Sequence, residues 1–159
     1  MVNLFRALEF LGLSVWLGSD IFLSFVVAPG VFRVLAPNRD QAGAVVGFAL
    51  TKMHLIGIAC GITILLLRLL RTKSFSTVFA PAALCLMLMI ALTAVSQLTV
   101  TPKMALLRRQ MGSIQATAAD NPLLAEFAKL HQISVSLESG ILLAGIVCMY
   151  LMVRELTHS

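Results

Sequence analysis

Four long apolar segments constrain this chain more than any other feature of its sequence. They cover approximately residues 4–32, 42–70, 78–100 and 123–153. A helix needs about 20 mostly apolar residues to cross the hydrocarbon core of a bilayer. Backbone groups in lipid must pair within one segment or in a closed barrel. Because the segments are far too long for barrel strands, they predict an all-α integral membrane four-helix bundle.

The composition supports a membrane protein with little else attached. Of the 159 residues, 59% are hydrophobic and only 12% are charged, and the mean hydropathy is +0.96. Soluble domains are roughly half apolar and a quarter charged. Four spans with short loops use up this length, so we expect a single transmembrane domain over residues 1–159. An even number of spans places both termini on the same side. We expect an integral protein of a bacterial inner membrane.

Turn signals separate the apolar segments. The loop "APNRDQ" (36–41) follows the first segment, and "RTKS" (71–74) follows the second. Pro29 lies late in the first segment, where it should kink or end a helix. Asn121 before Pro122 has the pattern of an N-cap followed by proline at the first helical position. Apolar residues at helical spacing over 102–112 predict a short interfacial helix in the 3–4 loop.

The net charge of +5 does not indicate nucleic-acid binding, because the basic residues gather at the ends of the segments, as in membrane proteins. They divide almost evenly between the two sides, so the positive-inside rule barely decides the orientation. The three cysteines lie inside the predicted helices without a close pair and are expected to act as small hydrophobes. The pairs Gly43/Gly47 and Gly57/Gly61 predict close helix contacts, either within the chain or in a homo-oligomer.

Ionisable residues inside the apolar segments are the main functional clue. At about 1.5 Å per residue, His131 lies about 13 Å and Glu138 about 24 Å from the start of the last helix. His54 lies about 18 Å into the second helix by the same rule. Such residues are costly in lipid and usually face the protein interior or water. We therefore predict a polar half-cavity opening toward the 1–2 and 3–4 loops, formed by His54, His131, Asp20, Glu138, Ser134, Gln97, Glu9 and Trp16.

The chemistry of this predicted cavity has several alternatives. His54 and His131 could ligate a metal with carboxylate support, or could hold haem b as an axial pair. Copper is possible because the chain is rich in methionine, although methionine is more often a core filler. The same groups could relay protons or ions, or bind a small polar solute. The simplest alternative is a structural subunit in which these groups only hydrogen-bond between helices.

Several stretches carry a resemblance to a known family. "LGLSVWLGSDIFLSFVVAPGVFRVL", "AGAVVGFALTKMHLIGIACG", "LTVTPKMALLRR" and "FAKLHQISVSLESGILLAG" together resemble the transmembrane-protein-205-like family. That resemblance covers almost the whole chain and implies a four-helix membrane protein. The family positions that it carries over are His54, Pro102, His131 and Ser134.

The stretch "LEFLGLSVWLGS" is also similar to the first helix of two other groups. These are the copper resistance protein D domain and the J-type protoporphyrinogen oxidase, and the second resemblance implies a haem-dependent membrane oxidoreductase. Both groups have histidine where this chain has Glu9, which leaves His54 and His131 as the candidate haem ligands. The sequence contains no soluble-enzyme motif. We therefore assign no catalytic residue and favour binding or transport over catalysis.

Overall fold

The computed structural model describes residues 2–157 and contains, within them, four helical spans and no strand. The predicted all-α bundle of membrane-spanning helices is thereby confirmed. The first span joins α1 (Val2–Phe22), the π-helix η1 (Leu23–Val27) and α2 (Ala28–Val34). The second span is α3 (Arg39–Thr72) and the fourth is α6 (Pro122–Thr157). The third span joins α4 (Pro81–Val95), the π-helix η3 (Ser96–Val100) and α5 (Thr101–Met111), and the short 3₁₀ helix η2 (Phe75–Phe79) precedes it.

The helix ends follow the local sequence signals. Asn38 caps α3 by accepting a hydrogen bond from the Gln41 backbone N–H at 3.0 Å. Asn121 does the same for α6 through the backbone N–H of Leu123, at 2.9 Å. Lys73 ends α3 in the left-handed conformation, with φ of 51°. The predicted loops and the cap at Asn121 are therefore present.

The third span departs from the prediction of a separate interfacial helix in the 3–4 loop. Residues 101–111 are helical, but α5 continues from α4 through η3, and the whole segment from Pro81 to Met111 is one candidate span. Pro29 likewise does not end the first span, which continues to Val34. Prolines usually break a helix because the ring clashes with the carbonyl four residues earlier.

A π-helix precedes Pro29 in the first span and Pro102 in the third span. The Ala28 N–H bonds to the Leu23 carbonyl, and the Thr101 N–H bonds to the Ser96 carbonyl, so each turn closes over five residues rather than four. The wider turn accommodates a proline without breaking the span. Single π-turns of this kind are frequent at functional sites.

The two helical hairpins repeat one another in detail. Hairpin 1 (residues 2–72) and hairpin 2 (residues 81–157) each place a π-helix and a proline in their first span, 73 positions apart. Five pairs of buried residues in the two first spans keep the same offset: Glu9/Ala82, Leu13/Leu86, Trp16/Met89, Asp20/Thr93 and Leu23/Ser96. The buried residues Leu17, Ala83, Val100 and Leu107 have no buried counterpart at this offset. The first spans of the two hairpins therefore share one arrangement of π-helix, proline and buried residues.

Glycine contacts in the second span of each hairpin follow the same relation. A Cβ atom on Gly61 would lie 2.8 Å from both Trp16 and Ile90, and one on Gly145 would lie 2.3 Å from Leu17 and 3.0 Å from Met89. Each glycine thus admits one side chain from its own hairpin and one from the other. Gly57 also packs against Trp16, so the pair Gly57/Gly61 is used within the chain. The homo-oligomer predicted through these glycines stays a prediction.

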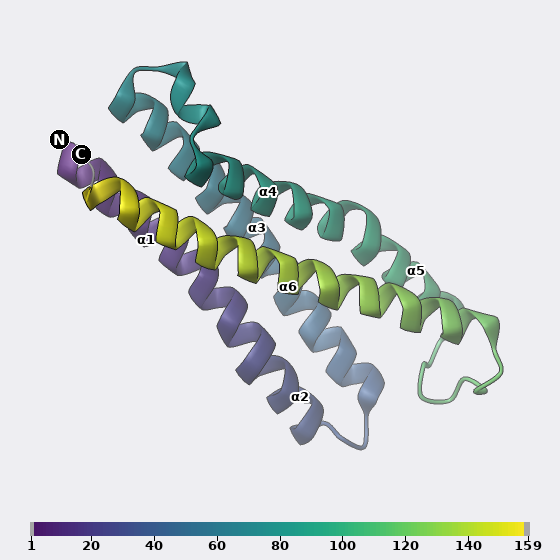
Figure 1. The fold of residues 1–159 in the computed structure, drawn as a ribbon. Helices are drawn as coiled ribbons and strands as arrows, with labels where there is room; N and C mark the ends of the chain where they lie inside the picture. Colours follow the sequence, from purple (N-terminus) through teal and green to yellow (C-terminus); the bar gives the residue numbers. More distant parts are fainter. Residues whose placement is uncertain (1, 158–159) are drawn as a thin grey trace.

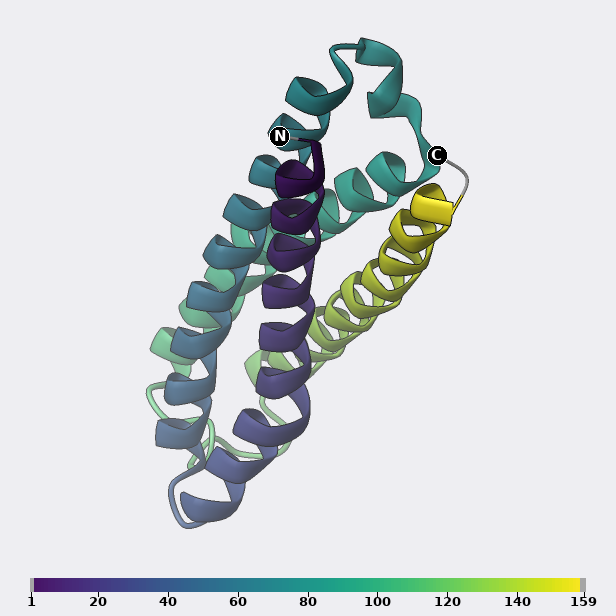
Figure 2. The ribbon, with the colours of Figure 1, turned by 90° about the vertical axis from the view of Figure 1, so that its left-hand side faces the viewer.

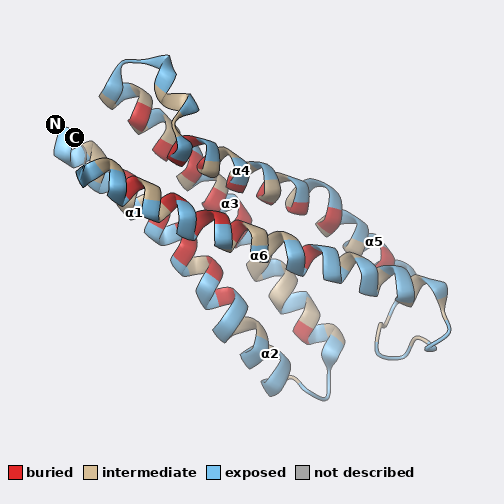
Figure 3. Ribbon diagram, in the orientation of Figure 1, coloured by how far each residue is buried: buried red, intermediate tan, exposed pale blue. Residues whose placement is uncertain are grey.

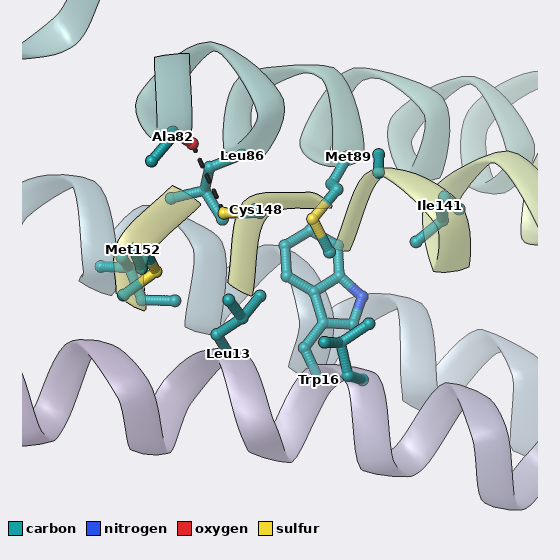
Figure 4. Close-up of a cluster of buried hydrophobic side chains, with 11 residues drawn as sticks. Leu13, Trp16, Ala82, Leu86, Met89, Ile141, Cys148 and Met152 are labelled. Atoms are coloured by element: carbon teal, nitrogen blue, oxygen red, sulfur yellow. Dashed lines mark hydrogen bonds between the residues drawn. The ribbon is translucent and has the colours of Figure 1, made fainter. Parts of the chain in front are cut away.

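The apolar core lies between the hairpins on the side of the chain termini. Figure 4 shows Leu13 and Trp16 facing Met89 and Cys148 across this interface. All three cysteines are free thiols, as the sequence predicted. Figure 3 shows buried residues gathered where α1, α3, α4 and α6 come together, while no residue of α2 is buried.

The two ends of the bundle differ in how closely the hairpins approach. α1 begins and α6 ends at the same end, which we call the terminal end, and there the hairpins lie together (Figure 1). At the other end, which carries residues 35–38 and 112–121 and which we call the loop end, they diverge (Figure 1), and Figure 2 draws the loop of hairpin 2 fainter, behind that of hairpin 1. The side of the membrane on which each end lies stays a prediction.

Candidate functional site

A pocket of about 510 Å³ occupies the space between the hairpins toward the loop end. All four spans contribute to its wall, which is mostly apolar. Its polar lining comes from Asp20, Ser24, Thr101, Arg108, His131, Ser134, Glu138 and Ser139. The structure therefore places a pocket in the half of the bundle where the sequence predicted one.

A hydrogen-bonded cluster lies at the deep end of this pocket. His54 is fully buried, and its Nε2 lies 2.8 Å from Oε1 of Glu138, while its Nδ1 lies 3.0 Å from Oε1 of Gln97. The Ser96 hydroxyl donates to the same Glu138 oxygen at 3.1 Å. Three spans meet in this cluster, and it joins hairpin 1 to hairpin 2.

The π-helices explain why these groups converge. Ser96 and Gln97 lie on η3, and Ser24, on η1, donates from its hydroxyl to Oδ1 of Asp20 at 3.2 Å. A π-turn rotates the residues that follow it relative to those before it, so polar groups can face the interior in the middle of an otherwise apolar span. Both π-helices thus supply polar contacts to the deep end.

Two carboxylate oxygens at the deep end have no hydrogen-bond partner among residues 2–157. Asp20 is 1% exposed and its Oδ2 makes no hydrogen bond, and the same holds for the buried Oε2 of Glu138. Both residues line the pocket. A buried carboxylate oxygen without a donor is costly, so each such oxygen in a folded protein calls for an explanation.

The structure separates the two histidines that the sequence grouped together. His54 lies behind Glu138 with both ring nitrogens engaged, whereas His131 is exposed and lies on the pocket wall. In this arrangement neither nitrogen of His54 is free to ligate haem iron opposite His131. Among residues 2–157, no group of three or more His, Cys, Asp or Glu side chains is arranged to hold a metal ion.

Glu9 and Trp16 lie outside the pocket. Trp16 is fully buried in the apolar core, and its Nε1 has no hydrogen-bond partner. Glu9 lies near the terminal end, where it accepts hydrogen bonds from Nε of Arg71 at 2.9 Å and Nε of Arg68 at 3.3 Å. Arg68 also pairs with Glu155. Glu9 and Asp20, which lie on the first helix, therefore belong to two different polar sites, the ion pairs near the terminal end and the pocket.

Sequence reasoning missed Arg108, which it assigned to an interfacial helix. Its guanidinium lies in the pocket against Gly43 and Gly47 and 5.7 Å from the centre of the Phe127 ring. The available signal was the pair Gly43/Gly47, because two small residues on one face must make room for some larger group. Here that group is an arginine side chain rather than another helix.

Comparison with known proteins identifies one family. A family model described as "Domain of unknown function (DUF4149)" matches residues 11–113, which include the first span from residue 11 onward and the whole of the second and third spans. No curated protein and no solved structure matches the chain. The resemblances to the transmembrane-protein-205-like family, the copper resistance protein D domain and the protoporphyrinogen oxidase are not confirmed and stay predictions. Within the matched region lie Asp20, His54, Gln97 and Arg108, while Glu138 lies beyond it on α6.

Proposed function

We propose that this integral membrane protein, which belongs to the DUF4149 family, binds a small amphipathic molecule through an ammonium or similar hydrogen-bond donor at Asp20 and Glu138. The observation that carries the proposal is the pair of unpartnered buried oxygens, Oδ2 of Asp20 and Oε2 of Glu138, in the wall of one pocket. An ionised carboxylate accepts hydrogen bonds and cannot donate them, so the group that complements it is a donor. A cationic donor gives a stronger bond than a neutral one.

The charge of the deep end favours a cation. If Asp20, Glu138 and His54 are all charged, the cluster carries one net negative charge inside a mostly apolar wall. Only one of the three, His54, can supply a positive charge, and it is already engaged by Glu138. A bound ammonium would neutralise the remaining carboxylate, which is otherwise an unpaired charge removed from water.

The pocket wall favours an amphipathic ligand over a small ion. Phe25 on the first span is 66% exposed and Val135 on the fourth is 51% exposed, and both line the pocket. Phe25 lies about 14 Å along the helix from Val34, at the loop end of its span. These exposed residues support an opening of the pocket to the outer surface at a depth where we expect lipid chains around the helices. A molecule with an apolar body could enter there from the bilayer.

Among the ligands predicted from the sequence, this geometry favours the small solute over a metal ion or haem. Both of those would need His54 as a ligand, and its two nitrogens already contact Gln97 and Glu138. A donor at Asp20 needs no rearrangement of that pair. Translocation of the ligand across the membrane and a haem-dependent reaction stay separate hypotheses.

The test compares hexylamine with hexanol, which has the same chain but a neutral head. Binding to the protein in phosphatidylcholine nanodiscs can be followed by fluorescence of Trp16, the single tryptophan, which lies about one helical turn from Asp20. Hexylamine should bind roughly 10-fold or more tightly than hexanol, since a hydrogen bond to a charged group contributes about 1.5–3 kcal/mol. The preference should disappear in Asp20→Asn.

Glu126→Gln is the matched control, because it removes a carboxylate from an exposed position of α6 that does not line the pocket. It should leave the preference for the amine unchanged. Equal affinity for hexylamine and hexanol, or a preference that survives in both Asp20→Asn and Glu138→Gln, would refute the proposed function.

A further inference from the structure

We propose that the ligand is an elongated amphiphile with an anionic group at its second end, a carboxylate or a phosphate, which binds Arg108. The inference rests on the proposed function for the deep end and adds a second subsite nearer the loop end. The pocket would then hold both ends of one molecule, with its apolar body between them.

Arg108 has unused hydrogen-bonding capacity inside the pocket. Its Nε is buried and has no partner, and within residues 2–157 it forms no ion pair with a carboxylate. Asp40 is close enough to interact electrostatically with Arg108. However, the oxygens of Asp40 accept from the Ser113 hydroxyl at 2.5 Å and from the Ile114 backbone N–H at 2.9 Å. The guanidinium therefore lacks the planar anionic partner that arginine binds best.

The surroundings of Arg108 hold its guanidinium in place. A Cβ atom at position 43 would lie 2.9 Å from its Nη2, and one at position 47 would lie 3.9 Å from its Nη1. The two glycines thus leave the space that the guanidinium occupies. Phe127 lies on its other side with a cation–π contact of 5.7 Å. A charged group kept inside a pocket by small and aromatic residues is typical of a binding site rather than of a headgroup-facing arginine, which extends into water.

The separation of the two subsites sets the length of the ligand. Phe127, which contacts Arg108, and Glu138 lie on the same helix, eleven residues apart, which corresponds to about 16 Å. Ala28, Leu50 and Val135 line the pocket as apolar residues of three different spans. The complementary molecule therefore has a protonated amine and an anionic group joined by an apolar chain of about this length.

The probe that matches this description is ω-aminododecanoic acid, with dodecylamine and dodecanoic acid as probes that each lack one charged end. In phosphatidylcholine nanodiscs, the two-ended probe should bind about 10-fold or more tightly than dodecylamine, because it adds a charge-assisted hydrogen bond. Arg108→Gln should reduce its affinity to that of dodecylamine and leave dodecylamine itself unaffected. Arg108→Lys should retain part of the gain in affinity, since lysine keeps the positive charge but lacks the planar set of guanidinium donors.

Arg109→Gln is the control, because Arg109 is exposed, adjacent in sequence and absent from the pocket wall. Equal affinity for ω-aminododecanoic acid and dodecylamine, with the Asp20-dependent preference for amines intact, would overturn the second subsite and leave the proposed function standing. Loss of amine binding altogether would overturn both. If the advantage of the two-ended probe disappears only when phosphatidylglycerol is added, the anion subsite is supported and a lipid phosphate is its competing occupant.

Discussion

The two ends of the bundle both bury charged groups, but they satisfy them differently. Near the terminal end, Glu9 and Arg68 are 2% and 3% exposed, and every oxygen of Glu9 accepts a hydrogen bond from an arginine. In the pocket toward the loop end, Asp20 is equally buried and one of its oxygens has no donor. Charge burial alone therefore does not mark a ligand site in this protein. The unsatisfied oxygen beside a pocket is the reason that we propose a ligand at Asp20 and none at Glu9.

The largest effect should follow from removing the negative charge at the terminal end. Glu9→Gln leaves the buried guanidinium of Arg68 with only the partly exposed Glu155 as its anionic partner. Breaking a buried pair in this way costs about 3–5 kcal/mol. We expect a loss of that size in the free energy of unfolding, measured by titration with a denaturing detergent. Glu155→Gln should cost clearly less, because Glu155 is 39% exposed. Equal losses for the two variants would contradict a difference based on burial.

A smaller loss of stability is expected when a methyl group is added at Gly57, where the second span packs against Trp16. A Cβ on Gly57 would lie 2.3 Å from the Trp16 Nε1, so Gly57→Ala must displace a fully buried indole. Overpacking of this kind costs about 1–3 kcal/mol. Gly18→Ala is the control, because no atom lies within 4 Å of the added methyl group. Thermal unfolding followed by Trp16 fluorescence should show a lower transition temperature only for Gly57→Ala.

The two carboxylates are compared most directly when Asp20, in the pocket, is replaced by its neutral isostere asparagine, as Glu9 is by glutamine. Asp20→Asn removes a carboxylate that has an unpartnered oxygen, and the new amide can still accept from Ser24. We expect the apo protein to gain stability by about 1 kcal/mol, since a neutral amide costs less to bury than a carboxylate whose charge is only partly compensated. The same type of change thus destabilises at Glu9 and stabilises at Asp20. A loss of more than 1 kcal/mol for Asp20→Asn in the same denaturation assay would mean that Asp20 is structural.

The sequence predicted the spans and much of the pocket because both depend on local information. Apolar length identifies membrane helices, and the cost of burying charge in lipid indicates that Asp20 and Glu138 face the interior. Helical periodicity then placed Ser134 on the same side as Glu138. These three residues line the pocket together, although their role as ligand contacts stays a prediction.

The sequence could not predict the features that depend on long-range contacts or on helix irregularities. The partners of Glu9 are Arg68 and Arg71, which lie 59 and 62 positions away in the chain. No periodicity reveals such a pairing. The π-helices before Pro29 and Pro102 keep both spans continuous where proline usually ends a helix. For the same reason Arg108 was expected at the membrane interface, whereas the continuous third span places it in the pocket.

The smallest effect is expected at His131, which the sequence grouped with His54. An exposed side chain that no hydrogen bond holds in place contributes little to stability, so His131→Ala should change the free energy of unfolding by less than about 0.5 kcal/mol. His54→Ala should cost several times more, because it leaves Gln97 and Glu138 without their shared partner. Both values can be measured by the same detergent denaturation. Similar losses for the two variants would mean that His131 belongs to the same polar cluster as His54, as the sequence grouped them.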